Sequence, residues 1–315
     1  MTCASSPSTV GAAAPSLWLF LLLSALLATA EGFFNPALGG LRAEIVPVGK
    51  LPDANAMLGV AKSAATIIGP ALAGFLIALS SPAVVIGLDA ASYGASVLAL
   101  ALLRVPPASQ PVRSPWRDLA ESWTVFRSRA WLWVTTVQFA LFNLLTWAPY
   151  LLLGPILARQ YLGGAGAWGA ITAAFAAGAV LAGLAMVGRR PRRPLAIATI
   201  GTFGFPVPCL MLALHAPVSA VAAGALLASA GAAVSNTLAA SVQQQQVPGQ
   251  MLARLNAITL TGAYALGSAG WAVIGPLAGV VGPVPLLAFA AAYGTVSSAV
   301  VLALPAIRSV TWVDR

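Results

Sequence analysis

Charged side chains are scarce in this sequence. Only 16 Lys or Arg and 7 Asp or Glu occur among 315 residues, so charged types make up 7% of the chain, whereas soluble domains contain about 25%. Two long stretches, 194–253 and 255–307, contain no charged residue. This scarcity excludes a soluble enzyme, a disordered chain and a nucleic-acid-binding protein, because each would need many more charges on its surface. The net charge of +9 therefore does not indicate nucleic acid as a partner.

The sequence also has few residues that hold disulfides or metals. It contains two cysteines, Cys3 and Cys209, and a single histidine, His215. They predict neither a disulfide framework nor a metal site. A phosphate-binding Gly-Lys-Ser/Thr loop is also missing, which leaves transport driven by ATP unsupported. We expect no cofactor and no metal.

Long apolar stretches dominate what is present. Apolar types make up 59% of the chain, and each charge-free stretch is long enough for two or more membrane spans of about 20 residues. The pattern predicts an all-α polytopic membrane protein, with the lipid bilayer as its partner. Turn residues and charges divide it into nine apolar stretches, at 16–38, 56–80, 83–103, 131–157, 166–188, 195–213, 217–240, 256–280 and 284–305.

Basic residues predict the orientation of these spans. All Lys and Arg except Lys62 and Arg159 fall in alternate connections or in the C-terminal tail, and such connections face the cytoplasm. The densest of them is a basic loop with Arg189, Arg190, Arg192 and Arg193. Nine spans then place the N-terminus outside the cell and the C-terminus in the cytoplasm of a multi-pass inner-membrane protein.

The first apolar stretch has an alternative interpretation as a secretory signal. Residues 17–27 are apolar, and Ala28-Thr29-Ala30 is typical of a cleavage site. A signal peptide also needs a positive N-terminal region, and residues 1–16 contain no Lys or Arg. A retained helix is the preferred interpretation.

An internal repeat relates two parts of the chain. Asn35, Val46-Pro47 and Asn55-Ala56 recur as Asn236, Val247-Pro248 and Asn256-Ala257, all at an offset of 201, and Gly69-Pro70 recurs at an offset of 206 as Gly275-Pro276. Parallel repeats of this kind build two-half transporters. At the same offset Ser16 lies opposite Pro217, which follows three helices in 130–216, so the first half is expected to lack about three spans.

The repeat predicts five regions. They are an N-terminal tail (1–15), a truncated first half of three helices (16–104), a cytoplasmic amphipathic linker (105–129), a second half of six helices (130–308) and a C-terminal tail (309–315). Within the linker, Trp116, Leu119, Trp123 and Phe126 share one helical face. We expect this helix to lie on the inner leaflet.

Several motifs of the chain resemble those of the major facilitator superfamily. The motifs are Phe34-Asn35-Pro36-Ala37, Ile45-Val46-Pro47, the run Leu51–Ala56, Gly69-Pro70-Ala71-Leu72-Ala73-Gly74 and the run Leu88–Tyr93. They are most similar to the branch of bacterial exporters that includes the enterobactin exporter and macrolide-type efflux proteins. The resemblance implies a two-half helical bundle in which these nine helices are spans four to twelve of twelve.

Two departures from the family pattern stand out. Ala73 replaces the first Gly of the Gly-Gly pair that ends the antiporter motif, and the basic loop after Gly188 lacks the family's Asp. The resemblance implies proton-coupled efflux of a small amphipathic compound, such as a drug or siderophore, by alternating access.

Three charged residues lie within predicted spans and are candidates for proton coupling, because charges are costly there. Glu31 and Lys62 are both expected roughly 10 Å below the inner surface, at about 1.5 Å per residue. They either form a pair that breaks during transport or carry the proton, or they remain a static pair that snorkels to water. Asp89 lies near the outer end of its helix, where a structural role is favoured.

Glycine and proline mark possible bends. Gly69-Pro70 and Gly275-Pro276, with Gly74, predict sites of close helix packing or gating.

The resemblance also implies a cavity lined by 16–38, 131–157 and 217–240. The polar and aromatic candidates there are Gln138, Asn143, Trp147, Tyr150, Ser235 and Asn236. Ordinary bonds between helices are the alternative for each. The run Gln243–Gln246 is expected to be a helix end and not a site.

The sequence therefore predicts a secondary transporter and not an enzyme. The acidic residues of the loops share no spacing typical of a lipid-modifying enzyme. The alternative is a truncated membrane protein that does not transport, such as a mis-started frame, a pseudogene product or a helper subunit.

The predicted topology places the two ends of the chain on opposite sides of the membrane. A reporter that fluoresces only in the cytoplasm should be active after residue 315 and inactive before residue 1. Reporter activity at both ends would contradict a nine-span arrangement.

Overall fold

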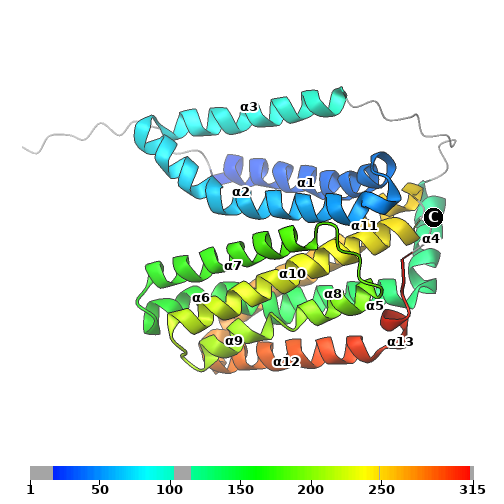
Figure 1. Cartoon of the computed structure of the whole chain (residues 1–315). Helices are drawn as coiled ribbons and strands as arrows, with labels where there is room; N and C mark the ends of the chain where they lie inside the picture. The colour runs from blue at the N-terminus through cyan, green and yellow to red at the C-terminus, as the bar shows by residue number, and fades with distance from the viewer. Residues whose placement is uncertain (1–16, 103–114, 248, 313–315) are drawn as a thin grey trace, which may run out of the picture.

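The computed structural model describes residues 17–102, 115–247 and 249–312 (Figure 1). These residues form helices joined by short turns, with no strand in the described part of the chain. The predicted all-α fold class is confirmed.

Except between α3 and α4, the helices follow one another with few residues between them. They are α1 (Leu17–Ile45), the short η1 (Val48–Lys50), α2 (Leu51–Leu79), α3 (Pro82–Ala101), α4 (Pro115–Ser128), α5 (Ala130–Phe142), η2 (Asn143–Trp147), α6 (Ala148–Tyr161), α7 (Ala165–Met186), α8 (Pro194–Thr202), α9 (Pro206–Ala213), α10 (Val218–Gln246), α11 (Gly249–Val281), α12 (Pro283–Ala303) and α13 (Pro305–Arg308).

Seven helical segments among the described residues are long and apolar enough to cross a membrane. They are Ala83–Ala101, Ala130–Tyr161, Ala165–Met186, Pro194–Ala213, Val218–Gln246, Met251–Val281 and Pro283–Ala303. The first two predicted stretches are helical as well, as α1 and α2, although they are not among these seven. The chain is therefore a multi-pass helical membrane protein.

Proline and glycine set the ends of many helices. Pro82, Pro194 and Pro283 each lie in the first turn of a helix, where a missing N–H costs nothing. Gly282 has a φ of 91° directly before α12, a conformation that a side chain would disfavour. The tight turn predicted at Gly282-Pro283 is thus present.

The helix Ala130–Tyr161 contains one irregular turn. Between α5 and α6, η2 is a π-helical turn, at Asn143–Trp147. Pro149, two residues later, cannot donate to Leu145, and its ring would collide with that carbonyl in a regular α-helix. We attribute the wider turn to this conflict, and it lies where Asn143 and Trp147 were predicted to line a cavity.

The helices lie side by side in Figure 1, with α5–α12 forming a packed bundle and α1 and α2 lying along one side of it. α2 contacts α7 and α10, and α1 contacts α11. The start of α3 packs against α2, but Figure 1 shows the rest of α3 apart from the bundle. Residues 86–102 are all exposed. We call α1–α3 the N-terminal unit and α5–α12 the C-terminal bundle.

Glycine permits the closest helix contacts inside the C-terminal bundle. Gly231 of α10 faces Gly201 of α8 so closely that a Cβ at Gly231 would overlap the carbonyl oxygen of Gly201. By contrast, nothing lies within 4 Å of a Cβ added at Gly69 or Gly275. No described residue thus packs closely at either position, and helix packing or gating there stays a prediction. The side-chain surroundings of Pro70 and Gly74 lie outside the described residues, while Pro276 lies inside α11.

Replacing Gly231 with valine should destabilise the protein. The added side chain would force α8 and α10 apart at a cost of about 1–3 kcal/mol, and this would lower the midpoint of thermal unfolding in detergent. The matched change Gly275→Ala should leave the midpoint unchanged or raise it, because alanine favours a helix by about 0.5–1 kcal/mol. Equal midpoints for Gly231→Val and the parent would show that α8 and α10 do not pack as described.

Candidate functional site

The N-terminal unit meets the C-terminal bundle through a close contact between α2 and α7. A Cβ added at Gly183 of α7 would lie 2.6 Å from Cγ2 of Val60. Ala56, one turn earlier on α2, is fully buried and shares an apolar cluster with Met186 and Leu238. These contacts join segments that are far apart in the sequence.

Four polar side chains lie at the same junction, and we call Arg42, Asn55, Ser241 and Gln244 the polar cluster. The Nδ2 group of Asn55 donates to Ser241 Oγ at 2.9 Å and to Gln244 Oε1 at 2.7 Å. Its Oδ1 accepts from Nη1 of Arg42 at 2.7 Å. The cluster therefore connects α1, α2 and α10.

Burial makes this cluster energetically important. Asn55 is 7% exposed, Ser241 is fully buried and Gln244 is 8% exposed. A typical hydrogen bond contributes about 1 kcal/mol, but a buried polar group left without its partner costs about 1–3 kcal/mol. Separation of α2 from α10 must therefore give each group another partner, such as water.

The repeat gives the junction a reciprocal form. Asn55 of α2 bonds to α10, while Asn256 of α11 lies against α1, where a Cβ added at Gly39 would lie 2.5 Å from its Nδ2. These two asparagines are related by the offset of 201. Gln244 also donates to the carbonyl of Gly39 at 3.4 Å, which links both sides of the junction.

The run Gln243–Gln246 ends α10 as expected, and two of its side chains also bond across the junction. Gln244 is buried in the polar cluster, and Gln245 donates to the carbonyl of Val48 at 3.2 Å. Amide side chains that project from a helix end between two helices can bond across the gap. The internal repeat could have indicated this role. At the offset of 201, the position of Gln244 corresponds to a position near the end of α1.

A second contact lies nearby and is electrostatic. Asp53 accepts a hydrogen bond from the backbone N–H of Gly188 at 2.7 Å, and its carboxylate lies 3.5 Å from the guanidinium of Arg190. Both side chains remain partly exposed, so this ion pair contributes at most about 1 kcal/mol. Arg189, Arg192 and Arg193 of the predicted basic loop are exposed.

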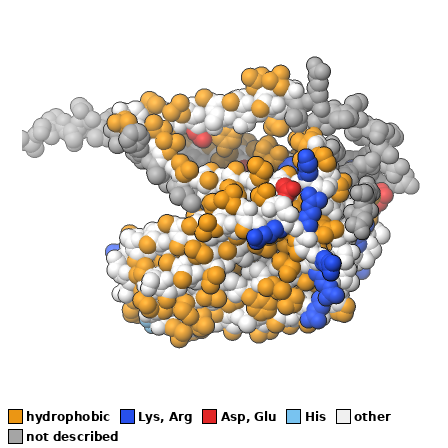
Figure 2. All heavy atoms as spheres, in the orientation of Figure 1, with side chains coloured by type: hydrophobic (Ala, Val, Ile, Leu, Met, Phe, Trp, Pro, Cys, Tyr) orange, Lys and Arg blue, Asp and Glu red, His pale blue; other side chains and the backbone are white. Residues whose placement is uncertain are grey.

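Figure 2 shows that Lys and Arg side chains gather at one end of the bundle. We use the term basic end for the part of the protein that holds the polar cluster, the Asp53–Arg190 pair and Arg129, which donates to the carbonyl of Gln246. The rest of the visible surface is mostly apolar, as expected for helices in lipid.

The predicted cavity residues have several different surroundings. Ser235 donates to the carbonyl of Ala198 within the C-terminal bundle, and Asn143 donates to Phe139 of its own helix at 2.8 Å. Both bonds fit the alternative interpretation, ordinary hydrogen bonding within or between helices. Gln138 is half-buried, and Asn236 is exposed on α10.

The two predicted aromatic residues belong to an aromatic cluster inside the bundle. Trp147 and Tyr150 stack with ring centres 5.9 Å apart, and both lie near Phe175. Tyr150 is 2% exposed, and its hydroxyl has no hydrogen-bond partner among the residues that the structure describes. Trp147 is half-buried, so of the two it has the greater access to the surface.

The three predicted coupling residues lie on the N-terminal unit. Glu31 is on α1, Lys62 on α2 and Asp89 on α3, and all three are exposed. The expected pairing of Glu31 with Lys62 stays a prediction.

The predicted amphipathic helix is present as α4, but part of its apolar face packs against protein. Phe126 is 7% exposed and joins a cluster with Leu132, Val247 and Leu255. Trp123, 48% exposed, stacks on Phe126 at 5.4 Å. The side chains of Trp116 and Leu119 lie outside the described residues. α4 is therefore anchored to the C-terminal bundle by its last turns.

Comparison with known proteins agrees with this architecture. The family model described as Major Facilitator Superfamily matches residues 1–276. No curated protein matches the chain. The match covers most of the sequence, including α1, α2 and α5–α10. The chain therefore belongs to the Major Facilitator Superfamily, a family of membrane transporters.

Proposed function

We propose that this transporter exports a small amphipathic compound by alternating access, in exchange for protons. In this proposal two halves, 16–104 and 130–308, are joined by the linker 105–129 and rock against each other in the inner membrane. The N-terminus lies outside and the basic end faces the cytoplasm. The polar cluster, which joins the two halves at one end only, is the observation that carries the proposal.

In this proposal the polar cluster holds the cytoplasmic end of the transporter closed. With Asn55 bonded to Ser241 and Gln244, a path between α2 and α10 is blocked. When this end opens, water replaces the protein partners in these hydrogen bonds. The difference in free energy between the open and closed states can therefore be small, although each bond of the closed state is well formed. A few kcal/mol is the range in which a substrate can shift such an equilibrium.

Two features support an amphipathic or aromatic substrate. The helix that carries Trp147 is irregular at that residue, and π-helical turns often occur at functional sites. The polar cavity candidates Gln138, Asn143, Ser235 and Asn236 are uncharged. Tyr150, which stacks on Trp147, brings a hydroxyl without a partner among the described residues. Such surroundings suit aromatic rings with few charges better than a sugar phosphate.

Proton coupling would require a carboxylate within a span of the N-terminal unit. Glu31 on α1 is the first candidate, with Lys62 as the group that pairs with its charged form. Asp89 on α3 is the second. Protonation of Glu31 would weaken its attraction to Lys62 and so favour a different arrangement of α1 and α2.

Export can be tested with ethidium, a fluorescent aromatic cation, in cells that express the full chain. We expect these cells to accumulate less ethidium than cells with an empty vector, and an ionophore that dissipates the proton gradient should remove the difference. Glu31→Gln should abolish gradient-dependent efflux, while Glu121→Gln, a carboxylate on α4 outside the spans, should not. Equal accumulation in expressing and empty cells would contradict the export of such cations.

Weakening the polar cluster should open the basic end. We expect Gln244→Leu to raise the ratio of open to closed molecules by about tenfold, because about 1.4 kcal/mol corresponds to that factor. Spin labels on cysteines at Lys50 and Arg192, one on each side of the junction, would report the two states as short and long distances. Native Cys3 and Cys209 would first be replaced.

Gln246→Leu provides the matched control for this experiment. Gln246 ends the same helix but bonds to the carbonyl of Thr311 in the C-terminal segment. Its replacement should leave the distance distribution unchanged. Identical distributions for Gln244→Leu and Gln246→Leu would mean that the polar cluster does not control closure.

A further inference from the structure

The loop between α7 and α8, 187–193, is held from two sides. On one side the carboxylate of Asp53, on α2, lies 3.5 Å from the guanidinium of Arg190. On the other side the indole N–H of Trp312 donates to the carbonyl of Pro191 at 2.8 Å. The two contacts therefore fall on neighbouring residues of the same loop.

The segment that carries Trp312 is itself fixed to the C-terminal bundle. We call residues 305–312, which contain α13, the α13 segment. Ile307 and Val310 are buried in an apolar cluster with residues of α5, α8 and α11. The hydrogen bond from Gln246 to this segment is exposed. The position of the α13 segment therefore depends on its buried side chains and not on Gln246.

Trp312 lies where two apolar clusters meet. It is half-buried and packs against the cluster that holds the α13 segment and against a second cluster. The second cluster contains Ala56 of α2 together with Met186 and Leu238, so it lies at the junction of the N-terminal unit and the C-terminal bundle. A tryptophan at such a place packs through its ring and donates its one N–H in a fixed direction.

The loop needs support from outside. It holds four like charges that repel one another, at Arg189, Arg190, Arg192 and Arg193. Both members of the Asp53–Arg190 pair are partly exposed, so the pair gains little free energy. Fixing the backbone of one loop residue costs at least as much. A loop that Trp312 already holds loses less entropy when it meets Asp53.

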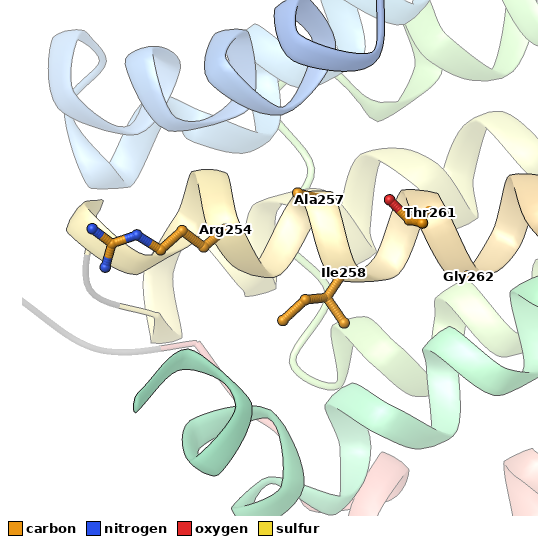
Figure 3. Close-up of a pocket in the computed structure, with 5 residues that line it drawn as sticks. All are labelled: Arg254, Ala257, Ile258, Thr261 and Gly262. Atoms are coloured by element: carbon orange, nitrogen blue, oxygen red, sulfur yellow. The ribbon is translucent and has the colours of Figure 1, made fainter. Parts of the chain in front are cut away.

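The position on α11 that the repeat relates to Asp53 has no such loop against it. At the offset of 201, Asp53 corresponds to Arg254. Figure 3 shows this region of α11, where an open groove with a volume of about 420 Å³ is lined by residues of α11 alone, Arg254, Ala257, Ile258, Thr261 and Gly262. The loop contact of Asp53 thus has no counterpart in this groove among the described residues. A change of Asp53 alone should therefore remove the effect of the loop.

We propose that Trp312 is a positioning residue for closure of the basic end. It holds the loop 187–193 where Arg190 reaches Asp53, and this favours the closed state. The role rests on the proposed opening and closing of the basic end. Loss of the indole N–H frees the loop, weakens the contact with Asp53 and favours the open state.

A spin label on Arg192→Cys, in a full chain without its native cysteines, measures the loop directly in lipid nanodiscs. Trp312→Phe keeps an aromatic ring but has no N–H, and we expect it to make the label more mobile than in the parent. Trp271→Phe, which changes an exposed tryptophan of α11, should leave the mobility unchanged. An unchanged mobility in Trp312→Phe would show that Trp312 does not hold the loop.

A double-mutant cycle then tests whether Trp312 acts through Asp53. Spin labels at Met57 and Leu184, exposed positions of α2 and α7 outside the loop and the α13 segment, report the open and closed states. We expect Trp312→Phe to raise the ratio of open to closed molecules about fivefold, because one hydrogen bond is lost. In a chain with Asp53→Ala the same change should alter the ratio less than about twofold, because the loop then has no carboxylate to meet.

The cycle separates this role from a general contribution to stability. Equal fold-changes with Asp53 and with Asp53→Ala would overturn the proposal. Two distances in the parent that Trp312→Phe does not alter would also overturn it, while the proposed opening would stand. A single distance that neither Gln244→Leu nor Trp312→Phe changes would remove the opening itself, and with it this role of Trp312.

Discussion

The need to pair buried amide groups in a membrane protein is the constraint on which the arrangement of the two units depends. Asn55 lies where α1, α2 and α10 meet, and each of its polar atoms has a partner on another helix. Lipid offers no replacement for those partners, since its hydrocarbon cannot form hydrogen bonds. The N-terminal unit is therefore fixed to the C-terminal bundle by a few directional contacts, in addition to apolar packing at Val60 and Gly183. A junction of this kind can open only where water reaches it.

The unequal packing of the two units is a second consequence. The C-terminal bundle has a large apolar cluster around Leu153, Cys209 and Leu287, and its glycines allow helices to cross closely. α3 is exposed along almost its whole length, and the groove of α11 is open. The internal repeat relates the covered surface of α2 to the open surface of α11.

The sequence predicted the helices well, because scarce charges and long apolar stretches are local signals. The nine stretches correspond to helices in the structure, and Pro82 and Pro283 mark helix starts as expected.

The sequence predicted the tertiary roles of single residues less well. Gln244 does lie in the last turn of α10, but its bonds across the junction do not depend on local pattern. Gly201 and Gly231, which do pack closely, are indistinguishable in sequence from the many other glycines in apolar helices. Asn55 was noticed only as part of the repeat and of a family motif, and its two partners on α10 are 186 and 189 residues away.

The central claim is that the basic end of the protein opens and closes in each transport cycle. A reversible crosslink between cysteines at Asp53 and Arg190, which face each other across the junction, tests it most directly. With a short, reducible bifunctional reagent in place, efflux should stop, and it should return when the crosslink is cleaved. Efflux that continues unchanged in fully crosslinked protein would contradict the account.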